Sequence, residues 1–135
     1  METRNFSSSQ ADFEKVVLAA LKELNFETEI EPTALEQRPD IVARSGDKII
    51  IIEAKIGNPN ATIPSVSLPQ AIDYFEAAKS KYHSNKVSTI VITNQKVPEK
   101  LKEMFSANGV VVGSVSTFNV SEIKGLITDS LKQTA

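Results

Sequence analysis

The sequence predicts a single mixed α/β domain in which helices cover a central sheet, and three observations lead to that prediction. Several segments carry apolar residues at helical spacing, and β-branched runs of strand length lie between them. The implied order of elements is α-β-β-β-α-β-α-β-α, without a repeat or a low-complexity linker. A chain of 135 residues is long enough for one compact core and too short for two ordinary domains, so we expect one domain over residues 1–135.

The first half of the chain is expected to form one helix and three strands. A single apolar stripe with i, i+3, i+4, i+7 spacing runs through SSSQADFEKVVLAALKELNF, which indicates a helix with one buried face. A short edge strand is expected in NFETEIE. Two apolar runs joined by a Ser-Gly-Asp turn make up RPDIVARSGDKIIIIEAK, which predicts a hairpin, and a loop with three prolines, GNPNATIPSVSLP, follows it.

The second half alternates helices with strands. A helix is expected in QAIDYFEAAKSKYH, where no Pro or Gly interrupts the apolar stripe, and a buried strand in the β-branched KVSTIVIT. The next helix, in VPEKLKEMFSANG, has Pro98 near its start and Asn108-Gly109 as its C-terminal stop. The strand VVVGSV and a helix with a thin apolar face, VSEIKGLITDSLKQ, complete the order.

Composition excludes several classes of function. Cysteine is absent, which removes disulfide frameworks, thiolate zinc sites and cysteine nucleophiles. The formal net charge is −2, so a polyanionic partner would have to be attracted by a local patch. No stretch approaches the roughly 18 to 20 apolar residues of a membrane span, and the N-terminal residues lack the apolar segment of a signal peptide. We therefore expect a cytoplasmic protein without a membrane partner.

The predicted hairpin brings acids together if its loop has two residues, Gly46 and Asp47. Gly at the first loop position suits a type II′ turn, and cross-strand partners then have numbers that sum to 93. Asp40 faces Glu53, with Cβ atoms about 4.5 to 5.5 Å apart, and Lys55 joins them on the same face. A three-residue loop would instead offset Asp40 from Glu53. The other face takes the apolar residues Ile41, Ala43, Ile50, Ile52 and Ala54.

Opposed carboxylates repel each other unless one is protonated or a cation lies between them. Hard oxygen ligands without cysteine favour Mg²⁺, with Mn²⁺ able to substitute. Lys55 would stand beside the metal, where an ammonium can stabilise charge on a phosphate or help to orient and deprotonate an attacking water. These parts together make a metal-assisted phosphodiester hydrolase. The alternative is that both acids are solvated at the strand ends and that Lys55 forms a surface ion pair.

These residues carry a resemblance to a known superfamily. RPD followed by IIIIEAK resembles the P-D…(D/E)-x-K motif of the restriction-endonuclease-like nucleases, with Pro39, Asp40, Glu53 and Lys55 as the matching residues. In that superfamily the motif lies on two adjacent strands of an αβββαβ core with a mixed central sheet flanked by helices. The resemblance therefore implies this core over most of the chain, with extra αβα elements at the C-terminal end.

Two further segments resemble branches of the superfamily. Glu14 resembles the first-helix acid of Mrr-like endonucleases and archaeal Holliday-junction resolvases, and by that resemblance it would be an additional metal ligand, directly or through water; the alternative is a solvated surface Glu. QAIDY resembles the Q-h-x-x-Y motif of RecB-like nucleases, in which these residues support the site and contact DNA. By that resemblance Gln70 and Tyr74 position the scissile strand.

The resemblance implies a Mg²⁺-dependent DNA endonuclease that hydrolyses a phosphodiester with metal-activated water. Asp40, Glu53 and Glu14 would hold the metal, Lys55 would be catalytic, and duplex or branched DNA would be the substrate. Junction-specific or structure-specific cleavage is one version of this hypothesis, and a homodimer in which each subunit cuts one strand is the expected assembly. The alternative is a catalytically weak nuclease-fold module that binds nucleic acid or a protein partner.

Overall fold

The computed structural model describes residues 6–30, 41–83, 86–116 and 119–133. Within these ranges the chain forms four helices and five strands, in the order that the sequence predicts. They are α1 (Phe6–Glu23), β1 (Glu27–Ile30), β2 (Ile41–Ser45), β3 (Lys48–Lys55), α2 (Ser67–Lys81), β4 (Lys86–Thr93), α3 (Glu99–Ala107), β5 (Val110–Ser114) and α4 (Val120–Gln133). The predicted αβββαβ core with a C-terminal αβα extension is confirmed.

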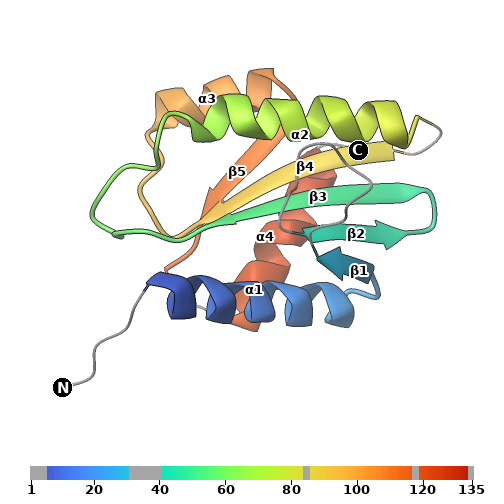
Figure 1. Ribbon diagram of the computed structural model, residues 1–135, viewed down its shortest axis with the longest axis horizontal. Helices are drawn as coiled ribbons and strands as arrows, with labels where there is room; N and C mark the ends of the chain where they lie inside the picture. Colours follow the sequence, from blue (N-terminus) through green and yellow to red (C-terminus); the bar gives the residue numbers. More distant parts are fainter. Residues whose placement is uncertain (1–5, 31–40, 84–85, 117–118, 134–135) are drawn as a thin grey trace.

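The five strands form one mixed sheet in the order β1-β2-β3-β4-β5 (Figure 1). The pairs β1-β2 and β2-β3 are antiparallel, whereas β3-β4 and β4-β5 are parallel. Each parallel step is made by a crossover through a helix, α2 for the first and α3 for the second, as parallel pairing requires. The carboxyl ends of β3, β4 and β5 gather at one end of the molecule, where α1 and α2 begin (Figure 1).

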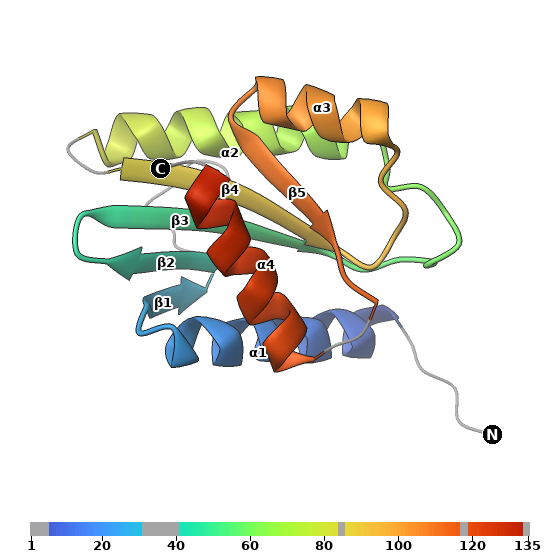
Figure 2. The same ribbon diagram turned by 180° about the vertical axis from the view of Figure 1, so that it is seen from behind.

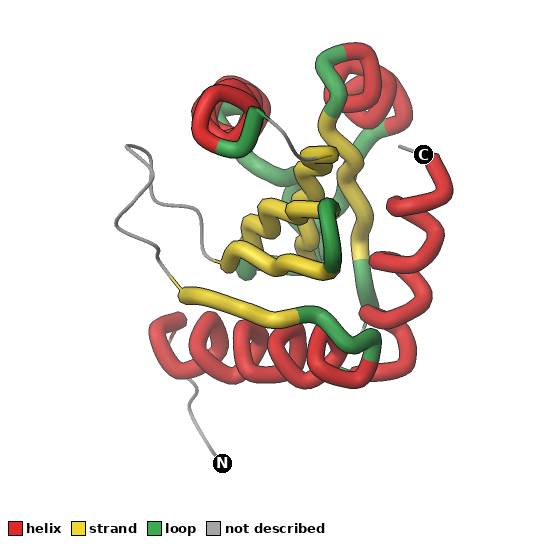
Figure 3. Tube along the Cα trace, turned by 90° about the vertical axis from the view of Figure 1, so that its right-hand side faces the viewer, coloured by secondary structure: helices red, strands yellow, loops and turns green. Residues whose placement is uncertain are grey.

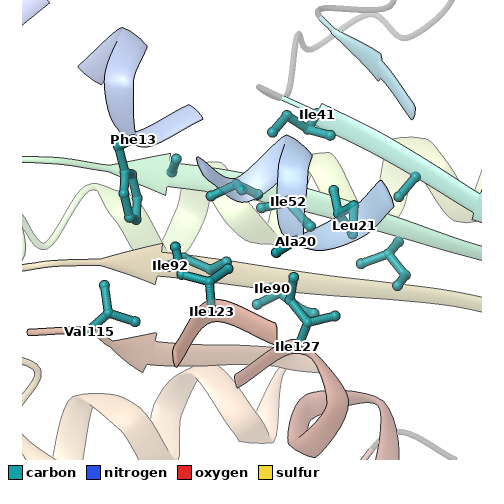
Figure 4. Packing of buried hydrophobic residues seen from close by; sticks show 14 residues of the cluster. Phe13, Ala20, Leu21, Ile41, Ile52, Ile90, Ile92, Val115, Ile123 and Ile127 are labelled. Carbon is teal, nitrogen blue, oxygen red and sulfur yellow. The ribbon is translucent and has the colours of Figure 1, made fainter. Parts of the chain in front are cut away.

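Helices cover both faces of the sheet, as Figures 2 and 3 show from two further directions. The largest cluster of buried side chains joins α1 and α4 to one face (Figure 4). Its strand residues include Ile41, Ala43, Ile50, Ile52 and Ala54, which is the apolar face predicted for the hairpin. Two smaller clusters pack α2 and α3 against the opposite face. The molecule therefore has three layers, with the sheet in the middle.

The hairpin turn has the predicted two-residue loop. Gly46 has a φ of 61°, and Asn25 is the only non-glycine residue with a positive φ in the described ranges, so Asp47 does not share that conformation. One positive φ at the first loop position is what a type II′ turn requires, and a type I′ turn would need two. Val42 pairs with Ile51 and Ser45 with Lys48, so the predicted register is confirmed over the described pairs.

The start of α2 differs from the sequence prediction, which ended the preceding loop at Pro69 and began the helix at Gln70. The helix begins at Ser67, so Pro69 lies in its first turn. Proline is tolerated there because the first N–H groups of a helix have no acceptor within the helix, and its fixed φ suits helical backbone. Pro69 therefore lies inside the beginning of the helix and does not end the loop before it. The helix starts three residues earlier than predicted.

β3 is buried more completely than an ordinary hairpin strand. All six residues from Ile49 to Ala54 are buried, because helices cover both faces and a strand lies on each side. The sequence predicted one core face and one face ending in charge. In the structure the second face is also core, with Val42, Ile49 and Ile51 packed with Ala78 of α2, and the charged β3 residues of that face, Glu53 and Lys55, lie at its carboxyl end.

None of the helices in the described ranges is both long enough and apolar enough to cross a membrane.

A glycine pair in neighbouring elements tests the packing of α4 on the sheet. A Cβ added to Gly113 of β5 would lie 2.2 Å from Cδ1 and 3.0 Å from Cγ of Leu126, so the whole Leu126 side chain would have to move. Gly113→Ala should lower the free energy of unfolding by about 1 to 3 kcal/mol. Urea denaturation followed by circular dichroism measures this change.

The matched control is Gly125→Ala in α4, where an added Cβ meets no atom within 4 Å. Alanine at an open helical position should raise the free energy of unfolding by about 0.5 to 1 kcal/mol. Equal effects of the two substitutions would contradict the close contact between α4 and β5.

Candidate active site

The carboxyl end of β3 places a carboxylate and an ammonium side by side in a mostly buried position. Glu53 and Lys55 are two residues apart on one strand, so their side chains leave the same face of the sheet. Lys55 Nζ lies 3.6 Å from Glu53 Oε2. The Glu53 side chain is 4% exposed and the Lys55 side chain 30% exposed, so the carboxylate is buried and the ammonium reaches the protein surface.

Gln70, in the first turns of α2, completes this group. Lys55 Nζ donates a hydrogen bond to Gln70 Oε1 at 3.2 Å. The helix covers the face of the sheet from which Glu53 and Lys55 project, and it begins at the same end of the molecule (Figure 1). The contact between the predicted catalytic lysine and the predicted positioning glutamine is therefore present, and it joins a strand to a helix 15 residues further along the chain.

Burial of Glu53 has an energetic consequence. A carboxylate taken out of water loses several kcal/mol of solvation unless an opposite charge and hydrogen bonds compensate. Lys55 supplies an opposite charge at 3.6 Å, and its own partial exposure keeps the ammonium in contact with solvent. A solvated acid at a fraying strand end, the alternative considered for Glu53, does not describe a residue that is 3% exposed.

Tyr74 lies one helical turn beyond Gln70, on the part of α2 that packs against the sheet. It is half-buried against the cluster of Val42, Ile49, Ile51 and Ala78. The structure thus gives Tyr74 a packing role in holding α2 on β2 and β3. Its predicted contact with a nucleic-acid strand stays a prediction.

Glu14 belongs to the other layer of the molecule. It is half-buried on α1, and its neighbour Phe13 is fully buried in the cluster between α1, α4 and the sheet. Figure 4 places Phe13 near the arrowheads of β3 and β4, so this part of α1 lies level with the strand ends. To join Glu53, the Glu14 side chain would have to reach around the end of the sheet from the face opposite α2.

Pro39 and Asp40 lie outside the described residues, so the predicted opposition of Asp40 and Glu53 stays a prediction. The first described pair of the hairpin is Ile41 with Ile52, directly before Glu53 in the strand. Within the ranges that the structure describes, no group of three or more His, Cys, Asp or Glu residues is placed to hold a metal ion. The donor chemistry of Glu53, a hard carboxylate oxygen, fits Mg²⁺, which proteins bind through one or two carboxylates together with water and substrate phosphate oxygens.

Sequence reasoning missed the residues that hold the chain directly after Lys55. Asn94 Oδ1 accepts a hydrogen bond from the Gly57 N–H at 3.0 Å, and Asn94 Nδ2 donates to the Gly57 carbonyl at 3.0 Å. Gln95 Nε2 donates to the Asn58 carbonyl at 3.3 Å. The only signal in the sequence is the polar run Thr93-Asn94-Gln95 after a buried strand, and its partner lies 37 residues away.

These hydrogen bonds join the segment that follows β3 to the segment that follows β4. Gly57 lies close against Gln95, because an added Cβ would lie 2.6 Å from Gln95 Nε2 and the Gln95 amide would have to move from its bond to Asn58. The loop after Gly57 is tied again where Ile63 N–H donates to the Lys96 carbonyl and Lys96 N–H donates to the Ala61 carbonyl. The loop between Lys55 and α2 is therefore held by hydrogen bonds both near its start and further along, at Ala61 and Ile63.

Comparisons with known proteins agree with this architecture. No protein-family model matches the chain, and no curated protein matches its sequence. A protein of unknown function, AF1548, is similar in structure, with a TM-score of 0.60 and 19% identity over 83% of this chain, which spans 64% of that protein. The small subunit (R.BspD6I2) of the heterodimeric restriction endonuclease R.BspD6I has a TM-score of 0.56 and 13% identity over 93% of this chain and 70% of its own.

The fold resembles that of a restriction endonuclease subunit. At these identities the likeness shows the fold alone, which in this protein is a mixed five-stranded sheet flanked by helices.

Replacing Asn94 tests the pair of hydrogen bonds between Asn94 and Gly57, which we call the Asn94 clamp. Asn94→Ala removes both hydrogen bonds to Gly57, so the Gly57 amide loses its acceptor. We expect faster hydrogen exchange at Gly57 and a loss of about 1 to 3 kcal/mol in the free energy of unfolding. Exchange measured by NMR gives the local effect, and Asn60→Ala at an exposed loop position is the control. Unchanged exchange at Gly57 in Asn94→Ala would show that the clamp does not hold the loop.

Proposed function

We propose that this protein is a Mg²⁺-dependent DNA endonuclease. The observation that carries the proposal is the group at the end of β3, in which buried Glu53 lies beside Lys55 and Lys55 is bonded to Gln70. The restriction-endonuclease-like fold supports it, because the P-D…(D/E)-x-K motif in the sequence falls on the two strands of the β2-β3 hairpin or directly before them.

The carboxylates Glu53 and Asp40 would hold the metal, with Glu14 as an additional ligand. Carboxylate oxygens are the donors that Mg²⁺ prefers, and burial of Glu53 excludes most competing water from one side of the site. The bound ion would supply Lewis acidity, which makes an attacking water more acidic and neutralises charge on the phosphate.

Lys55 is the group that this chain would present to the phosphate. An ammonium has three N–H donors, and Gln70 Oε1 accepts one of them. Glu53 Oε2 lies 3.6 Å from the ammonium, and 30% exposure of the Lys55 side chain leaves it accessible from solvent. A donor aimed at a phosphate oxygen stabilises the charge that develops during hydrolysis.

Gln70 would act through Lys55. The hydrogen bond at 3.2 Å restricts the lysine, whose long side chain otherwise has many rotamers, to the side of the sheet covered by α2. Tyr74 supports the same arrangement by packing α2 on the hairpin. The loop clamped by Asn94 sets the distance between the end of β3 and the start of α2.

A second function is favoured by a separate observation. The R.BspD6I2 chain is a subunit of a heterodimeric enzyme, and it resembles this protein over 93% of the chain. A nuclease-fold module that binds nucleic acid or a partner protein, with weak catalysis of its own, would share that architecture. A net charge of −2 also gives no general attraction to DNA.

Cleavage assays with purified protein test the first proposal. Labelled linear duplex, single-stranded, flap and four-way-junction DNA would be incubated with Mg²⁺, Mn²⁺ or EDTA. We expect cleavage with either metal ion and none with EDTA. Glu53→Gln, Asp40→Asn and Lys55→Ala should each lower the single-turnover rate at least about a hundredfold, because each removes a charge next to the reacting phosphate.

The matched control is Lys48→Ala, which removes an exposed lysine from the opposite end of the same strand and should leave the rate unchanged. Cleavage that survives in all three site variants would disprove the proposed site. Binding of one DNA form without cleavage by the wild-type protein would instead favour the binding module.

A further inference from the structure

The two edges of the sheet differ in chemistry. β1 forms one edge and carries two exposed glutamates, Glu27 and Glu29. β5 forms the other edge, and its sequence VVVGS contains no charged residue and no proline. Charged side chains and prolines are the usual means by which edge strands are protected from pairing with another chain. One edge is therefore protected against strand addition and the other is not.

An open hollow of about 190 Å³ runs along the unprotected edge. It is lined by Val110, Val111 and Val112 of β5 and by residues of α3. Side chains of consecutive strand residues point to opposite faces of a sheet, so three consecutive residues can border one hollow only along the strand's edge. The outward backbone N–H and C=O groups of β5 lie on that edge, and β4 is the only strand in the described ranges that pairs with β5.

α3 supplies the wall of this hollow with charged side chains in an alternating arrangement. Glu99, Lys102 and Glu103 line it, together with Ser106. None of the three charged residues forms an ion pair within the described part of the chain. Lys102 thus lies between two acids on an exposed helix surface, and the described residues offer it no ion-pair partner.

We propose that β5 pairs with β5 of a second copy of this chain, so that two sheets join into one across a twofold axis. Identical strands related by a twofold axis normal to the sheet run antiparallel, which gives the stronger of the two ladder types. The same axis brings the two α3 helices side by side and antiparallel on one face. Lys102 of each helix then lies opposite the acids Glu99 and Glu103 of the other, and this charge complementarity favours a second copy over an unrelated strand.

This inference does not depend on the proposed nuclease activity. It names the surface by which a dimer would form, and its test measures mass. Sedimentation velocity of the wild-type chain over a range of concentrations should show a reversible dimer. Lys102→Glu makes all three charged positions of α3 along the hollow acidic, opposite the same three acids in the partner, so we expect the dimer dissociation constant to rise about tenfold.

Two matched variants make the result specific. Lys100→Glu changes the same charge on the same helix at an exposed position that does not line the hollow, and it should leave the dissociation constant unchanged. The double variant Lys102→Glu with Glu103→Lys restores both signs and should restore dimerisation. Circular dichroism melts show whether each variant is folded.

A wild-type chain that stays monomeric at the highest attainable concentration would overturn the proposal. Equal effects of Lys102→Glu and Lys100→Glu would also overturn it, because the dimer would then use another surface. A dimer that behaves as expected while no DNA is cut would count against the nuclease function alone.

Discussion

Burial of β3 on both faces is the constraint on which the rest of the structure depends. The strand lies between β2 and β4, and helices cover both faces, so every side chain from Ile49 to Ala54 is shielded from water. Even-numbered side chains enter the cluster with α1 and α4, and odd-numbered ones face α2. Glu53 continues the odd series. Strand alternation alone therefore directs a carboxylate into the layer between the sheet and α2, where water is largely excluded.

A buried carboxylate requires an opposite charge and hydrogen-bond partners nearby. Lys55, the next residue on the same face, offsets the charge at 3.6 Å, and Gln70 in turn accepts a hydrogen bond from the lysine. The start of α2 must then lie within reach of the end of β3. The loop between them meets this requirement because Asn94, Gln95 and Lys96 bind it along its length. The loop after β4 thus determines how accurately the group at the end of β3 is held.

Most of the fold could be predicted from local patterns, and most of the site's support could not. The hairpin register followed from Gly46, because one glycine with positive φ selects the loop length. The end of α3 followed from Asn108-Gly109, and the order of all nine elements from periodicity. The Asn94–Gly57 pair depends on the parallel register that sets Lys55 beside Thr93, and no local pattern encodes a contact across 37 residues. Burial of the second face of β3 likewise depends on where α2 docks.

The mixed character of the sheet explains why chemistry should gather at the end of β3 rather than elsewhere. β2 runs antiparallel to β3 and β4 runs parallel to it, so the carboxyl end of β3 lies between the beginning of one strand and the end of another. Three chain segments that are far apart in sequence therefore meet there: the entry to β2, the exit of β3 and the exit of β4. Glu53, Lys55 and the Asn94 hydrogen bonds to Gly57 all lie at that junction, whereas Lys48, at the other end of the same strand, pairs with Ser45 beside the hairpin turn and with Lys86 at the beginning of β4.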